Sequence, residues 1–450
     1  MRKIHKIIRR LLGSKVTFTA LTGVFFQVSR PLVSLFTVPL LYGYLGESGL
    51  GLWMIALSIL GLAGFVSAGL SIRVVTEVGR ANDHHNKDDL NVILTATVLV
   101  AFIFALVVLL LTLPIAFFID WLILLNLDDV RLGNEFRHLL VLLSFVLAFG
   151  ILTGIPRFFM MGRMQGYIAH VLDFIGVLVG TVGLVIAVSN EAPLWVLGLV
   201  FIVPSYLIVM VGGILYMRRL GLSMPAIKYF KKDAFQLLGR DSLKMAGYQS
   251  AYAVSSQSDL ILIGIILGAP ASAIYGVAQR IFSLPILLAT AVNHAQWPVM
   301  ARADSENKSK EVIEMFLRTL MYGSGGALVA ALVTFAFYEE IQTLLVGYSL
   351  QTGLYLLIGM VAWVLVATLV NTCDTLLRAR GESSLLMRSM IIMSILNLSL
   401  TMLLLSKIGS SGAIWGSVIS YLLVLLIPYL IKIYQIYNNS DKALNGCTSK

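Results

Sequence analysis

Four polar side chains recur along one segment of the sequence at spacings that fit a single helix face. They are three, four and three residues apart and are Gln27, Arg30, Ser34 and Thr37. A helix turns once in about 3.6 residues, so these spacings predict one polar stripe. A guanidinium suits a phosphate, because its planar donors bind two oxygens at once. We therefore expect Arg30 to bind a phosphate-containing ligand, with the neighbouring polar groups lining its path.

A second stripe follows at a fixed interval of 222 residues. Its members are Gln249, Tyr252, Ser256 and Asp259. Leu45-Gly46 also recurs, as Leu267-Gly268, at the same interval. This repeat predicts two equivalent halves in parallel orientation, each opened by a polar-striped helix. Placing these polar side chains against lipid would cost free energy. We expect them to line a hydrated central cavity; the alternative is that they join helices by hydrogen bonds.

Two arginines, Arg30 and Arg280, fall inside apolar segments, where an arginine costs about 3 kcal/mol on insertion scales. Arg280 and Asp259 lie about equally far from a turn expected at Ala269-Pro270. Two interpretations are open for Arg280: an ion pair with Asp259, or a place in the binding site. Arg30 has no acidic residue near it in the next apolar segment, Gly49 to Ile72. This favours an anionic ligand for Arg30 over a distant structural partner.

Asp173 is a further acidic residue inside an apolar segment. A structural pair with Arg157 or Arg163 is the favoured interpretation. Coupling to an ion gradient is the alternative for Asp173, as it is for Asp259.

Other chemistry finds little support in the residue pattern. Cys373 and Cys447 are far apart and match no disulfide, zinc or redox spacing. No nucleophile with its base, phosphate-binding glycine loop or metal cluster has a useful spacing. We therefore expect neither an enzyme nor a bound cofactor or metal.

The elements that position the stripes must be transmembrane helices. With 58% hydrophobic and 12% charged residues, the chain cannot cover the surface of soluble domains. Crossing a bilayer takes about 20 apolar residues. Twelve runs of this kind are near Val16–Tyr44, Gly49–Ile72, Leu90–Ile119, Leu139–Phe159, Ile168–Val188, Pro193–Met217, Leu243–Leu267, Ala271–Val292, Val312–Tyr338, Leu354–Leu377, Leu385–Leu405 and Ala413–Ile433. The predicted fold is an all-α polytopic membrane protein of about 12 helices in two six-helix halves.

The cations predict how these helices are oriented. If the N-terminus is cytoplasmic, 28 of the 33 lysines and arginines lie in inner segments, which places both termini inside. The net charge of +10 then requires no nucleic-acid partner. The predicted parts are a basic amphipathic tail that contacts membrane lipid (1–15), the first bundle (16–217), a basic cytoplasmic linker (218–242), the second bundle (243–433) and a cytoplasmic tail (434–450). The first apolar run is too long for a cleavable signal peptide.

Several of these features resemble one transporter family. Tyr44-Leu45-Gly46 followed by Gly51-Leu52-Trp53, the stretch Tyr275–Pro285 and the paired halves are similar to the polysaccharide exporters of the multidrug/oligosaccharidyl-lipid/polysaccharide (MOP) flippase superfamily. Flippases of the Wzx O-antigen type are nearest in pattern, and the lipid II flippase MurJ is more distant. Arg280 lies where MurJ has a cavity arginine in its eighth helix. Two departures are twelve spans instead of fourteen, and Ala68 before Gly69 where exporters often carry aspartate.

The resemblance implies a multi-pass protein of the bacterial inner membrane that works by alternating access. Its cargo would be an undecaprenyl-pyrophosphate-linked oligosaccharide, with Arg30 and Arg280 on the pyrophosphate. A polymerase and a chain-length regulator of the same pathway would be its protein partners. Three alternatives stay open: a MATE-type multidrug or cation antiporter, a Wzy-type polymerase and a membrane scaffold. The longest outer loop, Asp120 to Arg137, is short for a polymerase, and a scaffold would leave the stripes without a role.

Overall fold

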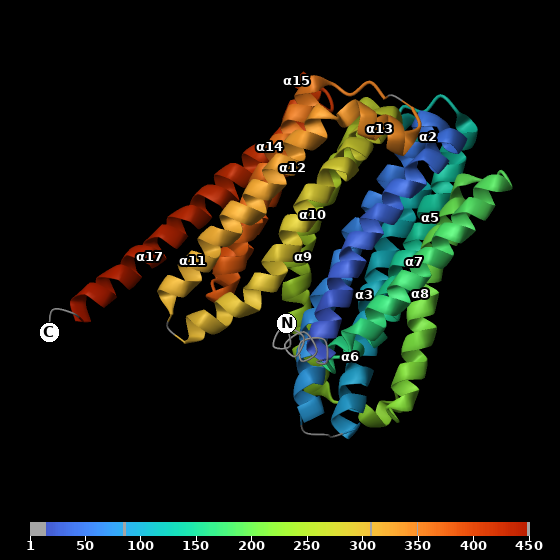
Figure 1. Ribbon diagram of the computed structural model, residues 1–450. Helices are drawn as coiled ribbons and strands as arrows, with labels where there is room; N and C mark the ends of the chain where they lie inside the picture. The colour runs from blue at the N-terminus through green and yellow to red at the C-terminus, as the bar shows by residue number, and fades with distance from the viewer. Residues whose placement is uncertain (1–14, 84–86, 307, 349, 448–450) are drawn as a thin grey trace, which may run out of the picture. The chain divides into compact units, whose positions relative to one another are not determined.

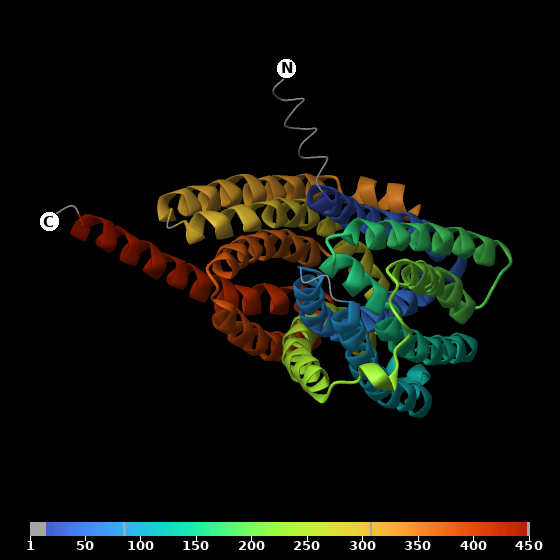
Figure 2. The same ribbon diagram turned by 90° about the horizontal axis from the view of Figure 1, so that it is seen from below.

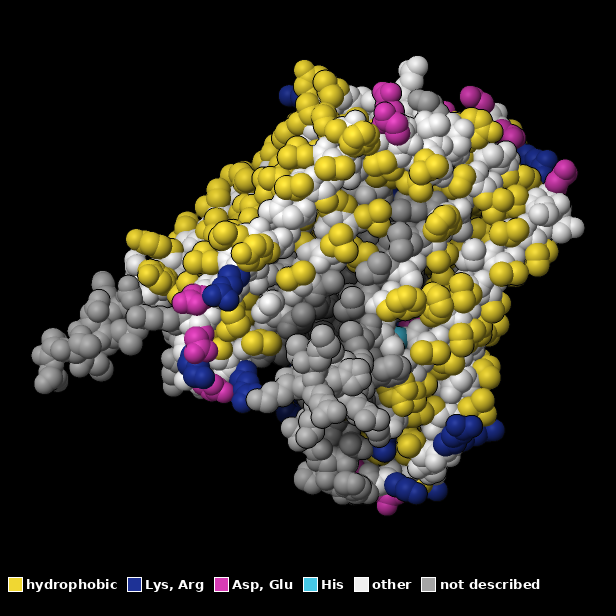
Figure 3. Space-filling view, in the orientation of Figure 1, with side chains coloured by type: hydrophobic (Ala, Val, Ile, Leu, Met, Phe, Trp, Pro, Cys, Tyr) yellow, Lys and Arg dark blue, Asp and Glu magenta, His cyan; other side chains and the backbone are white. Residues whose placement is uncertain are grey.

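The regular structure of the protein is helical. A computed structural model describes residues 15–83, 87–306, 308–348 and 350–447, and no strand occurs among them. Eleven stretches within this part are long and apolar enough to cross a membrane. On the face drawn in Figure 3, hydrophobic side chains cover the flanks of the helices and charged ones gather towards the helix ends. The predicted all-α, multi-pass membrane fold is confirmed.

The first two predicted spans form one long helix, α2 (Lys15–Asp83), that breaks at Gly46 with φ 68° and ψ −172°. One apolar stretch, Phe36–Leu62, runs across this break and takes the place of the first two predicted spans. The structure therefore has eleven apolar stretches in its described part where the sequence predicted twelve. The second Leu-Gly pair lies at a similar break. There Gly268, with φ 91° and ψ 166°, separates α9 (Lys232–Leu267) from α10 (Ala269–Ser305). Residues with a Cβ are strained at such positive φ, so both turns favour glycine.

The chain divides into two compact units, of which the first is Met1–Ala253. It holds α2 and the first part of α9 (Figure 1). Between them lie α3 (Lys87–Phe118), α4 (Trp121–Leu124), α5 (Val130–Thr153), α6 (Ile155–Gly162), α7 (Gly166–Ser189), α8 (Leu194–Arg219) and the 3-10 turn η1 (Ile227–Tyr229). Apolar side chains of α2, α3, α5 and α6 form one buried cluster, which includes Leu70, Val74, Ala96 and Phe159.

The second unit, Val254–Lys450, begins with the remainder of α9 and with α10. It continues with α11 (Ser309–Thr319), α12 (Gly325–Ala336), α13 (Tyr338–Val346), α14 (Leu354–Ala379), α15 (Ser383–Ile408), α16 (Ser411–Ser420) and α17 (Ile427–Cys447). Two π-helical segments, η2 (Leu320–Ser324) and η3 (Tyr421–Leu426), connect α11 to α12 and α16 to α17. The domain boundaries expected from the sequence stay a prediction.

Glycines four residues apart bring two helix pairs into close contact. In the first unit, a Cβ on Gly176 would lie 2.5 Å from the Cα of Ser205, and one on Gly180 would lie 2.3 Å from the carbonyl oxygen of Phe201. These contacts join α7 to α8, which lie side by side in Figures 1 and 2. Small residues at this spacing allow membrane helices to approach closely. The second unit repeats the arrangement with Gly412 and Gly416, which pack α16 against α15.

We expect Gly180→Ala to lower the stability of the first unit. The added methyl group would overlap backbone of α8, and overpacking of this kind costs about 1–3 kcal/mol. The matched control is Gly43→Ala in α2, because a Cβ there meets nothing within 4 Å. Thermal unfolding of the detergent-solubilised protein measures both variants. Equal midpoints for the two would contradict the close contact between α7 and α8.

Candidate functional site

The polar stripe of the first half lies on α2. Thr37 is buried, whereas the side chains of Gln27, Arg30 and Ser34 lie outside the described residues. Their alignment on one helix face and the role of Arg30 therefore stay predictions.

The stripe of the second half lies on α9, and its four side chains differ in burial. Tyr252 is exposed, Gln249 and Ser256 are half-buried, and Asp259 is buried with only 4% of its surface accessible. From Tyr252 towards the turn at Gly268 the side chains of the stripe become progressively more buried. Asp259 is the member that the fold of the second unit encloses.

Asp259 is held by hydroxyl groups from three other helices. Its Oδ2 accepts hydrogen bonds from the Tyr275 hydroxyl of α10 and the Ser417 hydroxyl of α16, each at 3.0 Å. Its Oδ1 lies 3.5 Å from the Thr401 hydroxyl of α15, at the limit of a hydrogen bond. All three donors are neutral. Within the described part of the chain, the carboxyl has no cationic partner.

The ion pair between Asp259 and Arg280 considered from the sequence is therefore wrong. Asp259 of α9 does lie against α10, as its depth in the helix predicted. The residue of α10 that contacts it is Tyr275. Arg280 follows Tyr275 by five residues, which corresponds to about 140° around a helix. Its guanidinium consequently projects from another face of α10.

Asn397 extends the hydroxyl network around Asp259. Its Nδ2 donates to the Ser417 hydroxyl at 2.9 Å and to the Ser420 hydroxyl at 3.4 Å. Its Oδ1 is buried and has no hydrogen-bond partner in the described residues. An unsatisfied buried oxygen costs about 1–3 kcal/mol, which makes this acceptor notable. The close approach of α16 to α15 at Gly416 brings these side chains together.

Arg280 is the second notable group of this unit. Its Nη1 is buried and lacks a hydrogen-bond partner among the residues that the structure describes. No ion pair of Arg280 occurs there either. Arg280 as a whole is half-buried. A charged donor withdrawn from water is normally paired, because its desolvation is costly. One donor of this guanidinium is therefore left without a described acceptor.

In the first unit, Asp173 is buried in α7 and forms an ion pair with Arg157 of α6. This confirms the structural pair that the sequence favoured, with Arg157 as the partner. His170 lies one turn before Asp173 on α7. It is close to α2, because a Cβ on Gly23 would be 3.3 Å from its Nε2. Ion coupling through Asp173 stays a prediction.

The sequence analysis did not identify Thr401, Ser417 or Asn397. A signal for them was present, since Asn397 and Thr401 are four residues apart within one apolar segment, and Ser417 and Ser420 three apart within the next. Such spacings place each pair on one helix face. Only the packing of α15 against α16 shows that Thr401 and Ser417 contact Asp259 and that Asn397 contacts Ser417 and Ser420.

Solved structures with a similar fold are transporters of the MOP superfamily. A multidrug resistance MATE transporter in an inward-facing conformation matches with a TM-score of 0.70 and 13% identity, over 93% of this chain and 99% of its own. An outward-facing one has a TM-score of 0.65 and 12% identity, over 96% and 98%. A MOP superfamily transporter from Pyrococcus furiosus, in which reverse polarity of the binding pocket suggests a different function, has a TM-score of 0.62 and 13% identity, over 96% and 98%. At these identities the likeness shows the fold alone.

Sequence comparison gives a family as well. The family model described as polysaccharide biosynthesis protein matches residues 20–304, which is more than half of the chain. No curated protein matches the chain.

Proposed function

Since the chain belongs to the polysaccharide biosynthesis protein family, we propose that it is a flippase for an undecaprenyl-pyrophosphate-linked oligosaccharide. The cargo is an O-antigen or similar repeat unit, moved by alternating access from the inner to the outer leaflet of the bacterial cytoplasmic membrane. Both termini face the cytoplasm in this proposal. The polymerase and chain-length regulator that use the exported unit are its expected partners.

The observation that carries the proposal is the buried Nη1 of Arg280, which has no described partner. A pyrophosphate offers paired anionic oxygens that match the planar donors of a guanidinium. In the absence of such a ligand, a buried donor of this kind is a net cost to the fold. Arg30, on α2, is proposed as the second pyrophosphate ligand because the sequence offers it no nearby acid.

The remaining stripe residues are proposed to line the path of the sugars. Their amides and hydroxyls can exchange hydrogen bonds with a glycan as it moves. They are Gln27, Ser34, Thr37, Gln249, Tyr252 and Ser256. The half-buried positions of Gln249 and Ser256 and the exposure of Tyr252 are compatible with this role.

Ion coupling is proposed for Asp259. Its carboxyl is buried and surrounded by neutral hydroxyls that can turn their lone pairs towards a cation. The unsatisfied Oδ1 of Asn397 supplies one more oxygen in the same network. Binding of a proton or a small cation there would change the charge between α9, α15 and α16. Asp173 is the less favoured candidate, because Arg157 already neutralises it.

Extrusion of cationic drugs is the second candidate function, favoured by the fold that the chain shares with MATE transporters. A cationic drug requires acidic or aromatic groups in its site. Asp259 is one buried acid, but its carboxyl is already bound by the hydroxyls of Tyr275 and Ser417, whereas the Nη1 of Arg280 has no described partner. The Pyrococcus furiosus relative shows that pocket polarity differs within this fold. We therefore favour an anionic cargo.

The proposal is tested by deleting the gene in its own host and restoring it with variants. Deletion should remove the surface glycan and cause lipid-linked repeat units to accumulate in the inner leaflet. Wild-type chain should restore display, whereas Arg30→Ala should lower it at least about tenfold, because bonds to charged groups contribute about 1.5–3 kcal/mol. Arg219→Ala, at an exposed cation that ends α8, is the control and should restore display.

Two results would contradict different parts of this proposal. Full display with Arg30→Ala at normal protein levels would overturn the anion site on α2. The other is an unchanged surface glycan after deletion together with increased sensitivity to cationic dyes, which would establish the multidrug alternative.

A further inference from the structure

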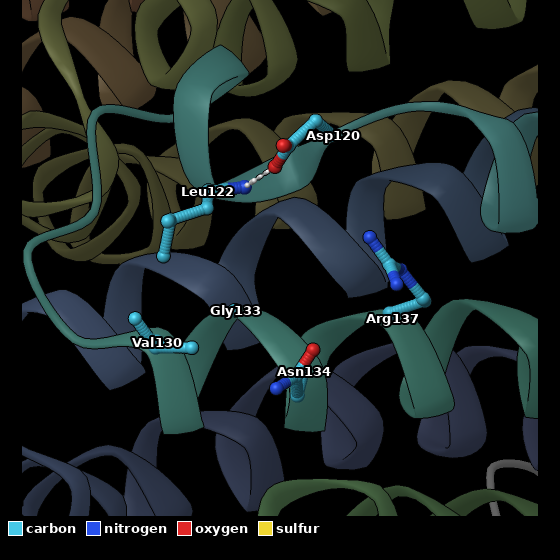
Figure 4. A pocket seen from close by; sticks show the side chains of 6 residues that line it. All are labelled: Asp120, Leu122, Val130, Gly133, Asn134 and Arg137. Carbon is cyan, nitrogen blue, oxygen red and sulfur yellow. Dashed lines mark hydrogen bonds between the residues drawn. The ribbon is translucent and has the colours of Figure 1, made fainter.

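A pocket of about 160 Å³ lies in the first unit where α3 connects to α5, and none of the groups assigned above lines it. It is lined by Asp120, Leu122, Val130, Gly133, Asn134 and Arg137. Figure 4 shows Asp120 and Leu122 on the side of the short helix α4, and the other four along α5. The α5 residues are spaced three, one and three apart, so they share one helix face.

The walls of this pocket are fixed by packing. Trp121 is buried, donates from its Nε1 to the carbonyl oxygen of Ala116 at 3.2 Å, and meets Phe136 edge to face at 5.6 Å. A Cβ on Gly133 would lie 3.1 Å from the Cδ1 of Leu122, so α4 and α5 are in close contact at the pocket floor. Asp120 accepts hydrogen bonds from the backbone N–H groups of Leu122 and Ile123. The pocket is therefore a feature of the folded unit and needs no ligand to form it.

The pocket presents one cation and one anion that do not pair with each other. Arg137 forms no ion pair among the described residues, and its Nε is buried without a hydrogen-bond partner. The acid nearest in sequence, Glu135, is already occupied by Arg131 at 2.9 Å and by the N–H of Leu194 at 2.8 Å. On the other wall, the hydrogen bonds that Asp120 accepts within the described chain come from backbone N–H groups alone. A ligand with separate negative and positive groups would satisfy both sides.

The surroundings of the pocket are apolar and exposed. Phe118, Ile123 and Val130 expose 88%, 73% and 61% of their surfaces beside it. Exposed apolar side chains continue along α3, among them Leu110, Leu111 and Ile115. Since α3 and α5 each contribute an apolar stretch long enough to cross a membrane, this surface is suited to acyl chains. The ligand would then join a charged headgroup to a hydrocarbon tail.

We propose that this pocket binds the headgroup of a zwitterionic phospholipid with a primary amine, the chemistry of phosphatidylethanolamine. The Arg137 guanidinium and the Asn134 amide bind the phosphate, and the Asp120 carboxylate binds the ammonium group. The acyl chains lie against the apolar side chains of α3 and α4. This site is independent of the proposed cargo, since it contains none of the residues assigned to transport.

Native mass spectrometry of the purified full-length protein tests the site. The probe is phosphatidylethanolamine with palmitoyl and oleoyl chains, compared with phosphatidylglycerol of the same chains and with soluble phosphoethanolamine. Wild type should retain phosphatidylethanolamine about tenfold more strongly than phosphatidylglycerol. Arg137→Gln should reduce retention of both lipids about tenfold, and Arg131→Gln, six residues earlier on the same helix and paired with Glu135, should leave it unchanged.

The Asp120→Asn variant removes the negative charge of this side chain and keeps its ability to cap α4. Asparagine caps a helix about as well as aspartate, so α4 should keep its start while the ammonium partner is lost. This variant should bind the two lipids equally. Equal binding of both lipids by wild type, or unchanged retention in Arg137→Gln, would overturn the proposal. So would binding of soluble phosphoethanolamine as strong as that of the lipid, because the apolar surroundings would then contribute nothing.

Discussion

Arg280→Met is expected to lower glycan display strongly without lowering the stability of the protein. The Nη1 of Arg280 is buried with no partner among the described residues, so the folded state gains little from its charge. Methionine keeps most of the side-chain volume and removes the desolvation cost. If Arg280 binds the pyrophosphate as proposed, the variant lacks this ligand, and display should fall at least about tenfold. Thermal unfolding measures the stability of the variant, and surface glycan at equal protein levels measures its transport activity.

The control for this prediction is Arg302→Met on the same helix. Arg302 is exposed and paired with Glu306 at 3.0 Å, so neither stability nor display should change much. Two results contradict the prediction in different ways. Full display with Arg280→Met would show that the cargo does not use this guanidinium. A large loss of folded protein would show that Arg280 has a structural partner.

Asp259→Asn should uncouple transport from its ion gradient while the second unit stays folded. The amide has nearly the shape of the carboxylate, and the hydroxyls of Tyr275 and Ser417 can rotate to accept from its new N–H₂ group. The amide can neither take up a proton nor offer a charge to a cation. We expect gradient-driven flipping in membrane vesicles to fall at least about tenfold, which corresponds to about 1.4 kcal/mol of lost coupling.

Tyr275→Phe is the matched variant for Asp259. It removes one donor from the carboxylate and leaves the charge in place, so it should cost about 1–3 kcal/mol of stability while the response to an imposed proton or sodium gradient persists. If Asp259→Asn responds to the gradient as wild type does, the carboxyl is a structural part of the helix packing. If Tyr275→Phe alone removes the response, coupling depends on the tyrosine hydroxyl and the assignment to Asp259 fails.

Much of the fold was accessible from the sequence because membrane insertion imposes local rules. Apolar runs must be long enough to cross a bilayer, and backbone polar groups must be satisfied within helices. The Leu-Gly repeat was equally informative, since Gly46 and Gly268 both have the positive φ that glycine tolerates. The glycines at positions 176 and 180, and those at 412 and 416, are also four residues apart in the sequence. The helices that they contact are known only from the tertiary structure.

The sequence by itself determined the membrane-spanning helical fold, the family and the depth of Asp259 along its helix. Only the tertiary structure decided the partners of the charged groups. Depth along a helix follows from counting residues, but the direction of a side chain depends on how neighbouring helices are rotated. For this reason Asp259 could be placed beside α10 correctly and still be given the wrong partner, Arg280 instead of Tyr275. The hydroxyls of Thr401 and Ser417 reach the same carboxyl from more than 140 residues away, a contact that no local pattern encodes.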